Sequence, residues 1–179
     1  MIRKDHSLNS LNEHSNNNVV LIGFMGSGKS SVGECLAKVT KRKFVDSDTV
    51  IETFEGKSIR DIFAQNGEPY FRAQEQACIH WMKSNLKNCV IATGGGMPIY
   101  SEGLDEVGKV IYLEASFESI KERLQGKEQG KRPLASEIAS LEKLYNSRLD
   151  KYVKSASLCI NVDRDIDTIV NQILKEENE

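Results

Sequence analysis

Residues Asn18–Thr40 read NVVLIGFMGSGKSSVGECLAKVT, and this stretch sets the expectation for the rest of the chain. Its apolar run Val19–Ile22 leads into the octet Gly23–Ser30, which fits the phosphate-binding P-loop pattern G-x-x-x-x-G-K-[ST]. Glycines allow a tight turn and a close approach of the backbone to an anion, because no Cβ blocks the way. The loop N–H groups and the N-terminus of the next helix then point at the phosphates. The stretch predicts a strand, a loop and a helix that bind a nucleoside triphosphate.

Two side chains of the octet have expected roles in phosphate chemistry. Lys29 is expected to reach the β- and γ-phosphates, and the Ser30 hydroxyl is expected to ligate Mg²⁺. The helix after the loop is predicted over Lys29–Lys41, and its apolar face is expected to hold Val32, Cys35, Leu36 and Val39. The cations near its end are interpreted as complements to the helix dipole and not as an RNA-binding patch.

Length and composition indicate a single ordinary domain. A chain of 179 residues with 39% hydrophobic and 28% charged residues is long enough to bury a proper core. Its formal net charge of −2 provides no bulk attraction to nucleic acid or anionic membranes, and no apolar run approaches the ~20 residues of a membrane span. The four widely spaced cysteines form no C-x-x-C pair, so we expect buried free thiols in a reducing compartment. These features predict a cytoplasmic protein without nucleic-acid or membrane partners.

The N-terminal segment differs in composition from the rest. Residues 1–17 are polar and rich in Asn, and are expected to form a disordered leader before a single domain over 18–179. His6 and His14 are interpreted as solvated side chains, because no Cys or carboxylate set completes a metal site around them.

Two carboxylates follow the next predicted strand, Lys43–Val45. Asp46 and Asp48 are two residues apart, so both are expected to project together at the strand's carboxyl end, where open parallel sheets bind their ligands. Asp48 alternatively caps the helix predicted over Thr49–Phe54. A P-loop in the same chain favours the functional interpretation.

Helices are then predicted over Ser58–Asn66 and Glu68–Leu86. Arg72 and Glu75 lie three residues apart in the second of them and share a face. They form either a surface ion pair of little energetic weight or an anion-binding arginine that its carboxylate positions. The helical spacing alone leaves both interpretations open.

The apolar run Asn88–Ala92 is typical of a buried parallel strand and ends in Thr93 and three glycines, Gly94–Gly96. Consecutive glycines at a strand end indicate backbone pressed against a ligand, with a flexible turn as the alternative. A further strand is predicted over Lys109–Leu113, followed by a helix over Phe117–Leu124.

Residues 125–136 contain two glycines, a proline and a cluster of cations, and form either a lid over the phosphates or a plain solvated loop. A helix is predicted over Glu137–Val153, a strand over Ser157–Val162 and a last helix over Asp165–Lys175. The last helix is expected to turn Ile166, Ile169, Val170 and Ile173 inward. Five strands that alternate with helices predict a three-layer α/β fold with a parallel sheet.

Six segments, in this order, resemble the shikimate kinase family: GFMGSGKS, FVDSD, FRAQE, TGGG, KRPL and LYNSRLDKY. The resemblance runs from about Asn18 to the end of the chain. It implies the P-loop fold of the nucleoside monophosphate kinases, with strand order 2-3-1-4-5, helices on both faces and a lid. It also implies transfer of the γ-phosphoryl group of ATP to the 3-hydroxyl of shikimate. The products are shikimate 3-phosphate and ADP, on the route to chorismate and the aromatic amino acids.

The resemblance also implies residue roles on the phosphate side of the reaction. The segment that cradles the phosphates matches Gly26, Ser27, Gly28, Lys29, Ser30 and Ser31. Asp46 matches a carboxylate that supports Mg²⁺, and Arg132 matches the lid arginine that reaches the transferring phosphate.

On the acceptor side, Asp48 matches the carboxylate that holds the shikimate hydroxyls and acts as base. A loose transition state lets the proton leave late, so no strongly raised pKa is expected of Asp48. Arg72 and Arg148 match two arginines that grip the substrate carboxylate, and Glu75 matches the acid that orients Arg72. The glycines that line the shikimate pocket match Gly94, Gly95 and Gly96. The family also implies a monomer.

The adenine contact departs from the family pattern. An arginine before the lid stacks on the base in many members, and the nearest candidates are Arg123 and Gln125. The C-terminal segment that closes over the base lacks the expected proline, so Arg164 is a further candidate for ATP binding.

Two other functions compete with this one. The first is a P-loop kinase for gluconate or a nucleoside monophosphate, which does not need Arg72, Arg148 and the triple glycine together. The second is a non-catalytic nucleotide-binding module, against which the intact set of Lys29, Ser30, Asp48 and Arg132 argues.

Overall fold

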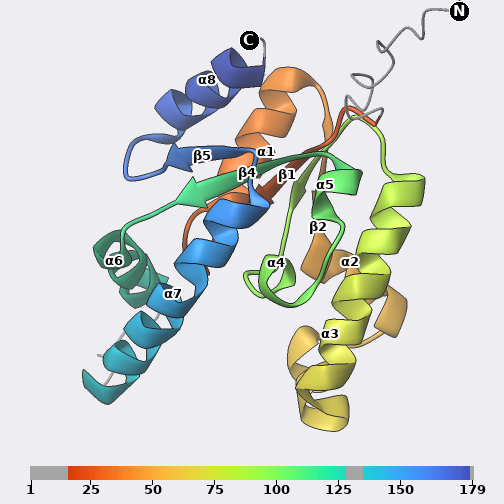
Figure 1. Cartoon of the computed structure of the whole chain (residues 1–179), viewed down its shortest axis with the longest axis vertical. Coiled ribbons are helices and arrows are strands. Elements are labelled where there is room, and N and C mark those ends of the chain that lie inside the picture. Colours follow the sequence, from red (N-terminus) through yellow and green to blue (C-terminus); the bar gives the residue numbers. More distant parts are fainter. Residues whose placement is uncertain (1–15, 128–134, 178–179) are drawn as a thin grey trace, which may run out of the picture.

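A sheet of five parallel strands runs through the centre of the computed structural model, which describes residues 16–127 and 135–177 (Figure 1). In chain order the strands are β1 (Val19–Ile22), β2 (Lys43–Asp46), β3 (Cys89–Ala92), β4 (Lys109–Glu114) and β5 (Leu158–Asn161). Their order in the sheet is β2-β3-β1-β4-β5, and every pairing is parallel. This confirms the predicted fold class and strand order.

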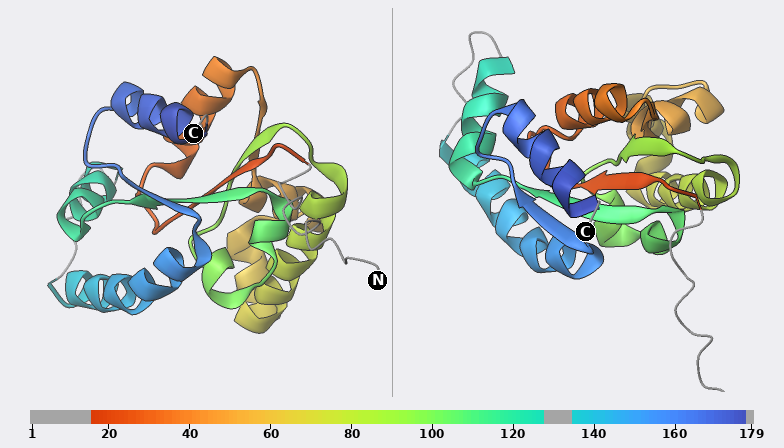
Figure 2. Two further views of the ribbon diagram at one scale, coloured as in Figure 1. Left: turned by 45° about the horizontal axis from the view of Figure 1, so that its top comes forward. Right: turned by 90° about the horizontal axis from the view of Figure 1, so that it is seen from above.

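Helices flank the sheet on both faces and make the predicted third layer. In the described part of the chain they are α1 (Lys29–Thr40), α2 (Ser47–Glu55), α3 (Ile59–Asn85), α4 (Met97–Tyr100), α5 (Leu104–Val107), α6 (Phe117–Lys127), α7 (Ala135–Ser155) and α8 (Ile166–Glu177). Helices α1 and α8 pack together on one face of the sheet, while α5 and α7 pack against β4 from the other (Figure 2). The carboxyl end of β4 leads into α6, which packs beside α7 (Figure 1).

The apolar run that opens the domain becomes the central strand. β1 lies between β3 and β4, with Val20 opposite both Ile91 and Val110, and all four of its residues are buried. A strand that is covered on both faces and paired at both edges needs an uninterrupted apolar sequence, which is why this segment shows no polar alternation. The P-loop therefore starts from the buried central strand of the sheet.

Local sequence explains where the predicted helices end. Lys41 ends α1 in the left-handed conformation, with φ of 57°. The Ser58 hydroxyl accepts a hydrogen bond from the Asp61 N–H at 3.1 Å and so caps α3. Gly67, with φ of 79°, kinks α3 immediately before Glu68. The two helices that the sequence predicts are therefore the two parts of α3 on either side of this kink.

Several local expectations are wrong. Val39 is 55% exposed and Ile166 is 41% exposed, although both were assigned to apolar faces. Val39 lies near the C-terminal end of α1, and Ile166 is the first residue of α8. Each lies near the end of its helix, where the covering layer stops. Cys159 is also exposed and not a buried thiol.

The sequence analysis also misplaced some segments. The short helices α4 and α5 follow the triple glycine and were not predicted. Residues Gln125–Lys127 belong to α6 and Ala135 begins α7, so both ends of the predicted lid are helical. Most of the predicted leader and residues 128–134 lie outside the described residues, so the leader and the lid stay predictions. None of the helices that the structure describes combines the length and apolar character needed to cross a membrane.

Candidate active site

The predicted P-loop connects β1 to α1 at the carboxyl edge of the sheet. Gly28 precedes α1 with φ of 91°, and no side chain caps this end of the helix. The first N–H groups of a helix have no partner within the helix. They are therefore available to a bound anion, as a phosphate-binding loop requires.

Lys29 is held against its own loop. Its Nζ atom donates hydrogen bonds to the carbonyl oxygens of Gly23 at 2.8 Å and Phe24 at 2.9 Å. Burial lowers the pKa of Lys29 to about 8, while the nearby carboxylates of Asp48 and Asp46 act in the opposite direction. The predicted phosphate cation Lys29, the predicted magnesium carboxylate Asp46 and the predicted acceptor carboxylate Asp48 therefore influence one another electrostatically.

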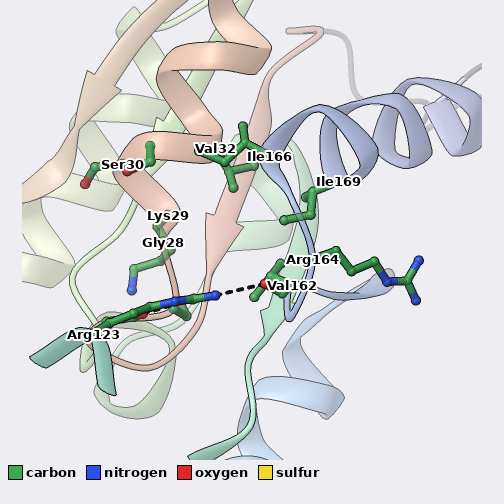
Figure 3. Close-up of a pocket in the computed structure, with 12 residues that line it drawn as sticks. Gly28, Lys29, Ser30, Val32, Arg123, Val162, Arg164, Ile166 and Ile169 are labelled. Carbon is green, nitrogen blue, oxygen red and sulfur yellow. Dashed lines mark hydrogen bonds between the residues drawn. The ribbon is translucent and has the colours of Figure 1, made fainter. Parts of the chain in front are cut away.

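A pocket of about 410 Å³ lies beside the P-loop, between it, α6 and the start of α8 (Figure 3). Its wall contains the P-loop residues Gly26, Ser27, Gly28, Lys29, Ser30 and Ser31, the apolar residues Val32, Val162, Ile166 and Ile169, and the two arginines Arg123 and Arg164. Phosphate-binding groups on one side and aliphatic side chains on the other suit the two ends of a nucleotide.

The candidates for an adenine contact differ in their placement in this pocket. Arg123 donates hydrogen bonds to the carbonyl oxygens of Gly26 at 3.2 Å and Val162 at 3.0 Å, and so spans the pocket between the P-loop and the segment after β5. The exposed side chain of Arg164 extends away from Lys29 (Figure 3). Gln125 is exposed on α6 and does not line the pocket.

Asp46 caps α2, so the alternative interpretation of Asp48 as the cap of this helix is wrong. The Asp46 Oδ1 atom accepts hydrogen bonds from the backbone N–H groups of Asp48 at 2.9 Å and Thr49 at 3.3 Å. β2 ends at Asp46, so Asp48 lies in the first turn of α2 and not on the strand. The two carboxylates still lie near each other across the start of α2. The charge of Asp46 therefore raises the pKa of Asp48.

The environment of Asp48 favours its protonated form. Burial, followed by the charge of Asp46, raises the pKa of Asp48 from 3.8 to about 6, against the opposing effect of Lys29. The expectation that the pKa of Asp48 is not strongly raised is therefore wrong.

The triple glycine approaches Asp48 directly. A Cβ on Gly94 would lie 2.7 Å from Asp48 Oδ1 and 3.4 Å from Glu75 Oε1. The Gly94 N–H donates to the Ser47 hydroxyl at 3.0 Å, which ties the glycines to the start of α2. This geometry favours close backbone approach over a flexible turn.

Arg72 and Glu75 form a partly buried pair and not a surface one. The Arg72 Nη1 atom is 2.7 Å from Glu75 Oε2, and the Glu75 side chain is only 1% exposed. Arg72 also pairs with Glu68 at 2.7 Å. Burial raises the pKa of Glu75 while Arg72 opposes the shift, as expected for a carboxylate that depends on its arginine.

Arg148 reaches the same region from α7. The residue is 8% exposed, and its Nη1 atom lies 3.5 Å from the carbonyl oxygen of Gly95. Tyr152, one turn further along α7, donates a hydrogen bond from its hydroxyl group to the same oxygen at 2.7 Å. Helix α7 therefore brings a buried cation to the predicted acceptor glycines.

Buried side-chain atoms without a hydrogen-bond partner concentrate in this region. Among the described residues they are Ser27 Oγ, Asp48 Oδ1, Glu75 Oε1, Ser101 Oγ and Arg148 Nε. Four of these five belong to predicted site residues; Ser101 is the exception. A buried polar atom without a partner is costly unless a ligand completes its hydrogen bonds. The cluster therefore indicates a polar ligand with both donors and acceptors.

Aromatic rings around the arginines were missed by the sequence analysis. The guanidinium carbon of Arg72 lies 4.1 Å from the ring centroid of Tyr100, 5.3 Å from that of Phe71 and 6.0 Å from that of Phe63. Tyr152 follows Arg148 by four residues, so the two side chains lie on the same face of α7. Nothing in the spacing after the triple glycine indicated Tyr100.

The oxygen donors present suit a magnesium ion that is held jointly with a nucleotide. No cluster of three or more His, Cys, Asp or Glu within the described ranges could hold a metal by itself. Ser30 on α1 and Asp46 at the end of β2 each offer hard oxygen atoms. Mg²⁺ commonly takes one or two protein oxygens and completes its shell with water and substrate phosphates. Arg132 lies outside the described residues, so its placement is not known.

Comparison with protein-family models matches residues 25–177 to the family described as shikimate kinase. The chain belongs to the shikimate kinase family. The shikimate kinase of Helicobacter hepaticus is 47% identical over 158 residues, which cover 88% of this chain and 94% of that protein. The family assignment makes the chain a kinase that uses ATP as co-substrate.

Solved structures support the same family. The shikimate kinase of Acinetobacter baumannii, determined in complex with shikimate, superposes with a TM-score of 0.77 at 30% identity and covers 92% of this chain and 94% of its own. The shikimate kinase of Bacteroides thetaiotaomicron gives a TM-score of 0.80 at 27% identity, with 90% and 98% coverage. The reaction of the family is ATP-dependent phosphorylation of shikimate.

Proposed function

We propose that this site transfers the γ-phosphoryl group of ATP to the 3-hydroxyl of shikimate and yields shikimate 3-phosphate and ADP, a step towards chorismate and the aromatic amino acids. The observation that carries the proposal is the cluster of unpartnered buried atoms on Asp48, Glu75 and Arg148, beside the P-loop lysine. An anionic triol supplies both the carboxylate and the hydroxyl groups that these atoms lack.

Arg72 and Arg148 bind the shikimate carboxylate. A planar guanidinium matches a carboxylate with two parallel N–H donors, and both arginines reach the triple glycine from different helices. Glu75 fixes Arg72 through the 2.7 Å ion pair. Gly94, Gly95 and Gly96 line this pocket because side chains there would fill the space of the acceptor or of its ligands.

Asp48 binds the acceptor hydroxyl and takes its proton. A base with a pKa of about 6 is mainly ionised at neutral pH, yet it is a stronger proton acceptor than an ordinary aspartate. The proton moves from the attacking 3-hydroxyl oxygen to an Asp48 oxygen as the oxygen–phosphorus bond forms and the bond to ADP breaks. Phosphoryl transfer then depends mostly on positioning and charge neutralisation.

On the phosphate side, the P-loop N–H groups hold the β-phosphate, and the Lys29 ammonium shifts from its loop carbonyls to the β- and γ-oxygens. Ser30 and Asp46 would supply the protein oxygens that hold Mg²⁺. The ion neutralises charge on the transferring group when bound. Arg132 supplies a further cation from the lid.

The adenine base lies in the 410 Å³ pocket between Arg123 and the aliphatic residues of α8. The two hydrogen bonds of Arg123 to backbone oxygens hold its guanidinium flat across the pocket, which suits stacking on a base (Figure 3). Arg164 contributes from the pocket edge. This assigns to Arg123 the main role that the sequence left open among three residues.

The protein acts as a cytoplasmic monomer with small-molecule substrates and without nucleic-acid or membrane partners. The net charge of −2 supports the part of the proposal that concerns nucleic acid and anionic membranes. Size-exclusion chromatography with light scattering checks the oligomeric state.

A coupled assay of ADP release across acceptors tests the function. Shikimate supports turnover, whereas gluconate and AMP do not. Turnover on AMP or gluconate in the absence of a shikimate response overturns the proposal.

A further inference from the structure

Tyr100, the last residue of α4, contacts both Arg72 and Arg148, which together we call the acceptor clamp. Its ring centroid lies 4.1 Å from the guanidinium carbon of Arg72 and 5.9 Å from that of Arg148. Arg72 belongs to α3 and Arg148 to α7. One aromatic ring is therefore shared by two cations that reach the site from separate helices.

The ring completes a tight enclosure around Arg72. A Cβ on Gly96 would overlap the Arg72 guanidinium, so the backbone of the glycine segment lies directly against that group. The Arg72 N–H groups make three hydrogen bonds to Glu68 and Glu75, out of the five donors that a guanidinium carries. Two N–H donors therefore remain at the edge of the group for a ligand.

Faces and edges of a guanidinium serve different partners. A carboxylate binds the edge through in-plane N–H groups, whereas an aromatic ring contacts the face. Tyr100 can therefore hold Arg72 without occupying the donors that the substrate needs. A ring shared with Arg148 also limits how far the two cations move relative to each other.

The position of Tyr100 is fixed by its backbone and not by burial of its side chain. Its N–H donates to the carbonyl oxygen of Gly96 at 3.1 Å. Lys151 Nζ of α7 donates to the preceding Ile99 carbonyl at 3.1 Å and ties α4 to α7. The residue itself is 51% exposed, so it contributes little to the core. Because half of the residue is exposed and its ring contacts two cations, its role lies in the site and not in core packing.

We propose that Tyr100 is a positioning residue for acceptor binding, whose ring holds Arg72 and Arg148 in register for the shikimate carboxylate. This inference rests on the proposed function, because it needs those arginines to bind the acceptor. Loss of the ring removes the one contact that the two guanidinium groups share, so their relative positions are less well defined. This weakens binding of the acceptor while the phosphate chemistry is retained.

Steady-state kinetics of three variants test the inference. Tyr100→Ala raises KM for shikimate about 3- to 30-fold, with KM for ATP and kcat changed by less than about twofold. Tyr100→Phe retains the ring and stays within about twofold of wild type. The control Phe54→Ala removes another exposed ring, which is 63% exposed and packs edge-to-face against Trp81, and it leaves KM for shikimate unchanged.

Three results overturn the inference. The first is an unchanged KM for shikimate in Tyr100→Ala, and the second is an equal rise of that KM in Tyr100→Phe. The third is a Tyr100→Ala variant in which KM for ATP rises and kcat falls as much as KM for shikimate rises. If Tyr100→Ala does not fold, Tyr100→Leu fills the space without a ring, and the same rise in KM is expected. A wild-type protein that is inert towards shikimate contradicts the proposed function as well. Normal wild-type turnover with an unaffected Tyr100→Ala contradicts only the role of Tyr100.

Discussion

The Cα atom of Gly94 lies so close to Asp48 that a Cβ added to it would be 2.7 Å from Asp48 Oδ1. Such a distance is too short for a carbon and an oxygen that are not bonded. The same Cβ would lie 3.4 Å from Glu75 Oε1. The absence of a side chain at Gly94 therefore lets the proposed base and the buried acid that positions Arg72 approach one another.

This contact predicts the effect of Gly94→Ala. The added methyl group displaces the Asp48 carboxylate, so kcat/KM for shikimate falls by about 100-fold or more. Nucleotide affinity, measured by titration with ADP, stays within about twofold because the P-loop is untouched. A variant with near-normal shikimate kinetics would show that Asp48 has room to move without loss of function.

Acidic pH is expected to inactivate the enzyme through Asp48. Protonation with a pKa of about 6 removes the base, so kcat/KM for shikimate falls about tenfold per unit as pH decreases below 6. A pH–rate profile measures this directly. A flat profile through pH 6 contradicts the assignment of the base.

The same shift predicts a stability effect of opposite sign to the activity effect. The folded protein binds the Asp48 proton more tightly than the unfolded chain, so this group adds stability as pH falls from about 6 to 3.8. At pH 7 the ionised carboxylate therefore destabilises the fold. We expect Asp48→Asn to abolish most shikimate turnover and to raise Tm at that pH, as calorimetry can show. A lower Tm, or a rate within about threefold of wild type, argues against this account.

Replacement of either clamp arginine is expected to affect the acceptor selectively. Arg72→Lys and Arg148→Lys lose the planar fork, so each raises KM for shikimate by about 10- to 100-fold with little change in KM for ATP. Arg42→Lys is the matched control, because Arg42 pairs with Glu177 at 2.8 Å outside the site. If Arg42→Lys raises KM for shikimate as much as the other two substitutions, the rise does not depend on contact with the acceptor, and the roles of Arg72 and Arg148 are wrong.

The placement of Arg123 and Arg164 predicts unequal roles in ATP binding. Arg123→Ala removes the group that spans the pocket between Gly26 and Val162, so KM for ATP rises by about tenfold or more. Arg164→Ala has an effect of less than about threefold, because its side chain extends away from Lys29 (Figure 3). The reverse ranking would assign the base contact to Arg164.

The features that follow from short-range pattern could be predicted from the sequence. The uninterrupted apolar run Val19–Ile22 specifies a strand buried on both faces, and the glycines and Lys29 specify the loop after it. Alternating strand and helix patterns then restrict the sheet to a parallel arrangement. The family resemblance supplied the strand order and the residue roles, and the structure confirms the strand order.

Features that depend on the packing of distant segments could not be predicted. Helical spacing placed Val39 on the apolar face of α1, but spacing does not show where the covering layer ends. The Arg72–Glu75 pair is buried because α4, which the sequence did not reveal, packs against α3. Asp46 and Asp48 are equally good caps, and only the end of β2 decides that Asp46 takes this role.

The most direct test identifies the product of the wild-type protein incubated with ATP, Mg²⁺ and shikimate. We predict shikimate-dependent release of ADP and a product whose phosphorus nucleus couples, in NMR spectra, to the proton on carbon 3 of the ring. Omission of shikimate, or its replacement by gluconate or AMP, leaves ATP unconsumed. Phosphate on another hydroxyl group of shikimate, or ADP release that does not depend on shikimate, would contradict the proposed function.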